Sequence, residues 1–149
     1  MNKIIKNTII LTIITLVSGV ALGAVYEITK APIANAQEEA KQEAYKQVFE
    51  DADSFDDLEV DAKEAAEAVK AAGVDDGAEI NEAVEAKQGG ETIGYVITAT
   101  DPNGYGGDIQ VSVGIQNDGT VNGIAILSIN ETAGLGMKAS EPEFYEQYS

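Results

Sequence analysis

Two short glycine-rich segments contain the residues of this chain best suited to hold a ligand. They are Gly104-Tyr105-Gly106-Gly107 and Glu131-Thr132-Ala133-Gly134-Leu135-Gly136. Glycine permits positive φ angles and a close approach of the backbone to a ligand. Backbone N–H groups exposed in such a loop can hold a phosphate or the edge of a planar ring. The spacing by itself also allows a simpler interpretation, in which the glycines only turn the chain at strand ends.

The residues between these two segments predict the element that positions them. Apolar residues alternate with polar or small ones over residues 109–116, which predicts a strand with one buried face. Asn117-Asp118-Gly119 has the composition of a hairpin turn, and the mostly apolar residues 121–129 predict a second, more fully buried strand. Because the chain runs up one strand and down the next, we expect both glycine-rich segments at the same end of this hairpin.

The composition excludes several kinds of chemistry. The chain has 149 residues, with 26 acidic and 9 basic side chains, a formal net charge of −17, and no His, Cys or Trp. A chain without His and Cys cannot form a disulfide, a Cys/His zinc site, a cysteine nucleophile or a histidine general base. A chain this acidic is repelled by phosphate backbones, so we predict that nucleic acid is not a partner. We assign no catalytic residue.

The N-terminal end predicts a membrane anchor. Residues 7–26 carry no charged side chain; Lys3 and Lys6 precede them, and all 26 acidic residues follow. An α-helix of this length spans about 30 Å, the thickness of the hydrocarbon core of a bilayer. The positive-inside rule then places residues 1–6 in the cytoplasm and the acidic remainder outside it, in a single-pass protein of the plasma (inner) membrane. A cleaved signal peptide is the alternative, because Ala34-Asn35-Ala36 resembles a signal-peptidase site.

A membrane-proximal helix is predicted over residues 27–50. Pro32 is expected to kink or end the anchor helix. The residues after it show a narrow apolar stripe that includes Ala36, Ala44, Tyr45 and Phe49. This stripe suits a helix that docks on a domain, and a simple stalk is the alternative.

An acidic segment, residues 51–90, is predicted to be helical or loop. Residues 51–57 have the composition of a calcium-binding loop but lack the EF-hand spacing, so we predict a solvated loop and no metal site. Residues 61–72 are rich in good helix formers and are followed by Gly73, a typical helix stop. Residues 78–87 fit either a short helix or the approach to a strand.

Together these elements predict an α+β protein. An N-terminal transmembrane helix is followed by a small domain with an antiparallel sheet of at least three strands and flanking helices. The β-rich part covers residues 91–149. No strand or long helix is predicted after Gly136, where such a domain normally closes its sheet, so we expect a domain that is incomplete at its C-terminal end.

The two glycine-rich segments resemble a known family. Gly104-Tyr105, Gly107 and Glu131-Thr132-x-Gly134-Leu135-Gly136 are similar to the pattern in the FMN-binding domain of the G subunit of Rnf-type electron transport complexes. The C subunit of sodium-pumping NADH:quinone reductases belongs to the same superfamily. Ala133 stands where this family usually has proline, a change that removes a φ constraint but no donor or charge. The resemblance covers essentially the whole chain and is weakest over residues 60–87.

The resemblance implies an electron-carrier subunit rather than a stand-alone enzyme. Its partners would be other membrane subunits of a translocase that couples electron transfer to ion translocation. FMN would lie outside the cytoplasm, linked through its phosphate to a threonine of a Ser/Thr-Gly-Ala-Thr motif. That motif does not occur in these 149 residues, and we assign no substitute threonine. The flavin-binding residues implied by the resemblance are Gly104, Tyr105, Gly107, Glu131, Thr132, Gly134, Leu135 and Gly136.

Two other functions stay open. The absence of the attachment motif favours a membrane-tethered structural or ligand-binding module without a redox cofactor. Cleavage near Ala36 would instead release a soluble acidic protein. N-terminal sequencing separates the second possibility from the anchored forms.

Overall fold

The computed structural model describes residues 2–74 and 77–148 of the chain. The chain forms two compact units, Met1–Glu39 and Ala40–Ser149. The first unit is helical, and the second contains an antiparallel sheet with short helices. The α+β fold class predicted from the sequence is therefore confirmed.

Helix α1, Lys3–Val48, is one continuous helix. Within it, an apolar window has a mean hydropathy of 2.3 and no buried residue, as in a helix able to cross a membrane. The hydroxyl of Thr8 donates to the carbonyl of Ile4 at 3.0 Å, and that of Thr12 donates to the carbonyl of Thr8 at 2.9 Å. Both hydroxyls therefore have hydrogen-bond partners without water. Of the two alternatives expected at Pro32, a kink or an end of the helix, the end is wrong, because Pro32 lies inside α1. A proline removes one backbone hydrogen bond, but helix-forming residues on both sides continue the helix.

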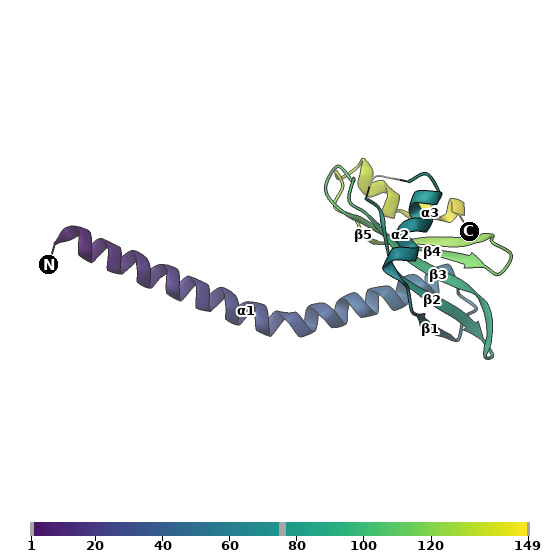
Figure 1. Cartoon of the computed structure of the whole chain (residues 1–149), viewed down its shortest axis with the longest axis horizontal. Helices are drawn as coiled ribbons and strands as arrows, with labels where there is room; N and C mark the ends of the chain where they lie inside the picture. The colour runs from purple at the N-terminus through teal and green to yellow at the C-terminus, as the bar shows by residue number, and fades with distance from the viewer. Residues whose placement is uncertain (1, 75–76, 149) are drawn as a thin grey trace. The chain divides into compact units, whose positions relative to one another are not determined.

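The sheet has five antiparallel strands that lie side by side in chain order (Figure 1). The strands are β1 Ser54–Leu58, β2 Glu79–Gln88, β3 Glu91–Asp101, β4 Ile109–Gln116 and β5 Val121–Ser128. The prediction of a helical or loop segment over residues 51–90 is therefore wrong at β1 and β2. The Glu- and Ala-rich sequence of β2 favours a helix in isolation, but pairing with strands on both sides outweighs that preference.

The end of α1 docks on one face of the sheet. Ala44, Tyr45 and Val48 are buried there together with Phe49, and they pack with Val84, Ala86, Val96 and Ala125 of the sheet. The docked-helix interpretation of the apolar stripe is confirmed for these residues, whereas Ala36 is exposed.

Small residues let the helix approach this face closely. A Cβ added at Gly114 would lie 2.9 Å from Val48 Cβ, and one at Gly94 would meet the ring of Phe49. Gly114 pairs with Gly123 of the next strand. In β4 and β5 the buried face is thus lined by glycine, alanine and serine rather than by large apolar side chains.

The burial predicted for β4 is wrong in its choice of face, and β5 is not the more fully buried strand that was predicted. Ser112 and Gly114 are the buried residues of β4, and the alternating Ile and Val residues are only half-buried. In β5 only Gly123 and Ala125 are buried. The alternation is real, but α1 covers the small-residue face because a helix packs there at shorter distance.

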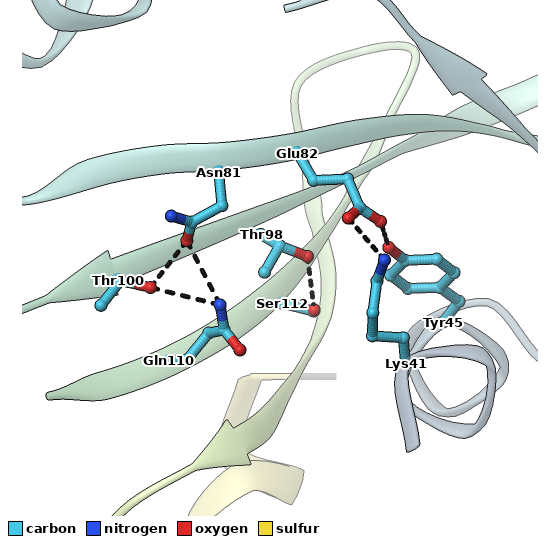
Figure 2. A network of polar contacts seen from close by, with 8 residues as sticks. All are labelled: Lys41, Tyr45, Asn81, Glu82, Thr98, Thr100, Gln110 and Ser112. Carbon is cyan, nitrogen blue, oxygen red and sulfur yellow. Dashed lines mark hydrogen bonds and ion pairs between the residues drawn. The ribbon is translucent and has the colours of Figure 1, made fainter. Parts of the chain in front are cut away.

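Polar side chains complete the covered face (Figure 2). Tyr45 donates a hydrogen bond to Glu82, whose other oxygen is 2.6 Å from Lys41 Nζ. The hydroxyls of Thr98 and Ser112 lie 2.8 Å apart and are both buried. The described residues leave no buried side-chain N or O atom without a hydrogen-bond partner. The face beneath α1 therefore holds polar side chains whose hydrogen-bonding groups are paired within the protein.

Short helices lie against strands β2 and β5. Helix α2, Ala62–Ala71, contacts β2; Asp61 caps it by accepting from the backbone of Lys63 and Glu64, and Gly73 follows it at φ 83°. This confirms the predicted helix over residues 61–72 and its stop. Three short helices close the described chain and contact β5: η1 Gly136–Ser140, α3 Pro142–Tyr145 and η2 Glu146–Tyr148.

Candidate functional site

The two glycine-rich segments meet at one end of the β4–β5 hairpin. Gln110, at the start of β4, pairs with Ser128, at the end of β5. The segment with Gly104 therefore enters the hairpin where the segment with Glu131 leaves it. We call these segments loop A, residues 102–108, and loop B, residues 129–136.

Glu131 joins the two loops. Its Oε1 accepts a hydrogen bond of 3.1 Å from the backbone N–H of Gly106 in loop A. Its aliphatic part packs on loop B, because a Cβ added at Gly136 would lie 2.5 Å from Glu131 Cβ and 2.8 Å from Cγ. A Cβ at Gly104 would lie 2.9 Å from Glu131 Oε1. Gly136 is thus small because the Glu131 side chain occupies the space beside it, whereas a Cβ at Gly104 would first meet the carbonyl oxygen of Gly107.

Gly106 was not among the predicted site residues, yet it makes the closest contact between the loops. A Cβ at this position would overlap the carbonyl oxygen of Asn130. The signal in the sequence was its place inside the Gly-Tyr-Gly-Gly run. The contact itself depends on the hairpin register, which the run does not reveal.

Two other glycines of the site face open space. Gly107 has φ 119° and Gly134 has φ 75°, and no atom lies within 4 Å of a Cβ added at either position. Their backbone conformation favours glycine, and their surface is accessible. These two positions, unlike Gly104 and Gly136, leave room for a ligand to approach the backbone.

Two large apolar side chains of the site are exposed although their loops are fixed. Tyr105 is 93% exposed in loop A, and Leu135 is 72% exposed in loop B. The carbonyl of Thr132 accepts from the N–H of Leu135 at 3.0 Å and from that of Met137 at 3.3 Å, which holds loop B in a tight turn. An exposed tyrosine and leucine on anchored backbone can contact a flat apolar ring or a partner protein.

A separate cavity of about 530 Å³ lies at the other end of the hairpin. Gln116 and Asn122 line it, together with the end of α1 at Val48 and Phe49. Asn122 Nδ2 donates to the carbonyl of Val48 at 2.5 Å, and Gln116 Nε2 donates to Asn122 Oδ1 at 2.6 Å. The side-chain amides of Gln116 and Asn122 therefore hydrogen-bond to one another and to the helix end.

Comparison with known proteins gives two family matches. Residues 1–48 match the RnfG N-terminal region, and residues 104–148 match the FMN-binding domain. The first match ends where α1 ends, and the second contains loop A from Gly104 onward, the hairpin and loop B. The fold and the joined loops therefore define a protein with an N-terminal apolar helix and an FMN-binding domain.

Similar proteins narrow the family further. The G subunit of the Na(+)-translocating ferredoxin:NAD(+) oxidoreductase complex of Acetobacterium woodii is 33% identical, over 92% of this chain and 65% of that protein. The G subunit of the proton-translocating complex of Clostridium ljungdahlii is 34% identical, over 99% of this chain and 69% of that protein. The chain belongs to the RnfG family, the G subunits of ion-translocating ferredoxin:NAD oxidoreductase complexes. It spans about two thirds of the length of these two relatives.

Proposed function

We propose that this chain is the extracytoplasmic, FMN-binding subunit of a membrane complex that couples electron transfer to ion translocation. The observation that carries the proposal is the joining of loops A and B, which presents two open glycine backbones and two exposed apolar side chains at one place. This place lies inside the residues that match the FMN-binding domain. FMN supplies one- and two-electron transfer when it is bound.

The residues at the loops suit a flavin in three respects. Gly107 and Gly134 leave their backbone accessible to a phosphate or a ring edge. The side chains of Tyr105 and Leu135 offer apolar surface for a planar ring. The carbonyl of Thr132 accepts the backbone hydrogen bonds that hold the turn of loop B, next to Gly134 and Leu135. The eight residues implied by the resemblance therefore form two groups. Gly104, Glu131, Thr132 and Gly136 hold the loops, and Tyr105, Gly107, Gly134 and Leu135 offer contact to a flavin.

Gly134→Val is expected to raise the dissociation constant for FMN by about tenfold. The substitution places a β-branched residue at φ 75° and fills the open space beside the backbone. Fluorescence titration of FMN with the full chain in detergent micelles measures the change. Gly119→Val is the matched control, because Gly119 has φ 86° and open space but lies in the β4–β5 turn. Equal FMN affinity of the Gly134 variant and the wild type would remove loop B from the site.

Intact mass of the protein purified from its native membrane tests whether the flavin is covalently attached. An FMN adduct would support the redox subunit. No adduct, together with no FMN binding in the titration, would instead support a membrane-tethered module without a redox cofactor. These 149 residues contain no Ser/Thr-Gly-Ala-Thr motif, and they span about two thirds of the length of the relatives.

Residues 40–149 are proposed to lie outside the cytoplasm, with other subunits of the complex as partners. The support is the charge asymmetry around the apolar helix, with Lys3 and Lys6 on one side and the acidic residues on the other. The chain has no cysteine, so single-cysteine variants report topology without background. We expect a membrane-impermeant maleimide added to intact cells to label Asp118→Cys and not Asn2→Cys. The reverse labelling pattern would contradict the proposed orientation.

A further inference from the structure

Glu131 has an unusual position for a residue expected to touch an anionic cofactor. Its side chain is half-buried between loops A and B rather than directed to the open side with Tyr105 and Leu135. One carboxylate oxygen receives the N–H of Gly106, and the stem packs on Gly136. Oε1 of Glu131 is therefore already used by the backbone of loop A, and its aliphatic stem is packed against Gly136.

The negative charge of Glu131 also argues against direct contact between its carboxylate and the phosphate of FMN. FMN carries a phosphate, and a carboxylate in direct contact with it would be repelled. A carboxylate that accepts a backbone N–H, by contrast, makes one of the stronger hydrogen bonds available to a loop. A Cβ at Gly136 would displace Glu131, and one at Gly106 would overlap the carbonyl oxygen of Asn130, so two glycines are fitted around this connection.

We propose that Glu131 is a positioning residue that holds loops A and B together and does not contact the flavin. The role rests on the proposed function for its ligand, but the connection between the loops is a property of the protein alone. Glu131 then acts through its contacts with Gly106 and Gly136, which fix the positions of Tyr105 and Leu135. This assigns to Glu131 a different role from Tyr105 and Leu135, whose exposed side chains offer contact.

Amide hydrogen exchange of the flavin-free protein tests the connection. Glu131→Met keeps the aliphatic stem against Gly136 but removes the acceptor, and Glu131→Gln keeps both. We expect exchange at the Gly106 amide to rise about tenfold in the Met variant and to stay near the wild-type rate in the Gln variant. Protection of the β3 and β4 amides reports in the same spectra whether each variant is folded. Unchanged exchange at Gly106 in the folded Met variant would overturn the proposal.

Asp118 provides a matched control at the other end of the hairpin. Its Oδ1 accepts the backbone N–H of Thr120 at 2.9 Å, and this hydrogen bond lowers the pKa of Asp118. Asp118→Ala should raise exchange at Thr120 and leave Gly106 unchanged. The Glu131 effect is thereby separated from a general loosening of the hairpin.

FMN binding and the flavin midpoint potential test the second half of the proposal. A positioning role predicts that Glu131→Gln keeps the FMN dissociation constant within about twofold and leaves the potential unchanged, while Glu131→Met weakens binding about tenfold. A shift of the potential in the Gln variant would overturn the proposal, because loss of the charge would then act on the flavin directly. If the wild type binds no FMN, the proposed function fails, and the exchange experiment still decides whether Glu131 joins the loops.

Discussion

Gly94→Val should destabilise the sheet domain by about 3 kcal/mol, at the upper end of the usual range for an overpacked core. A Cβ at this position would lie 2.5 Å from the carbonyl oxygen of Ile115 and would overlap the ring of Phe49. The carbonyl of Ile115 belongs to the backbone of the neighbouring strand, which cannot move without breaking the β3–β4 pairing. The greater strand propensity of valine, worth less than about 1 kcal/mol, does not offset this clash.

Urea unfolding of the full chain in detergent micelles, followed by circular dichroism, measures this effect. With a slope near 1.5 kcal/mol per molar urea, the midpoint should fall by about 2 M. Ala99→Val is the control, since it adds volume on the same strand but on the opposite, half-buried face. Similar midpoints for the two variants would show that the face beneath α1 is not packed as closely as the structure indicates.

The sequence predicted which segments form the site better than it predicted the interior. Both glycine-rich loops, the hairpin between them and their meeting at one end follow from the hairpin turn at residues 117–119 and from the chain reversal it produces. Helix α2 was also predictable, because Asp61 and Gly73 supply local signals at its two ends. Each of these features depends on residues close in the chain.

The features that were missed depend on residues far apart. Strand β2 reads as a possible helix until β1 and β3 pair with it. The alternation in β4 shows that its two faces differ, but not which face α1 covers. Close packing of the helix end on Gly94 and Gly114 selected the small-residue face. The hydrogen bond between Gly106 and Glu131 likewise depends on the register of β4 and β5, which no local pattern shows.

Tyr45→Ala is expected to destabilise the sheet domain by about 3–5 kcal/mol, the usual cost of truncating a buried aromatic residue. Tyr45 is 2% exposed, its ring centroid lies 5.4 Å from that of Phe55, and its hydroxyl donates to Glu82. Tyr45→Phe should cost only about 1 kcal/mol, because it removes the hydroxyl and keeps the ring. Glu82 retains its ion pair with Lys41 in both variants.

Tyr26→Ala is the matched control for this prediction, because Tyr26 lies in the same helix and is 61% exposed. Urea unfolding followed by circular dichroism should separate Tyr45→Ala from Tyr26→Ala by more than about 1 M in midpoint. That result would mean that the last turns of α1 are part of the domain core, so the helix that carries the apolar anchor also completes the fold. Equal midpoints would instead make the end of α1 a stalk, and the domain would then be stable without it.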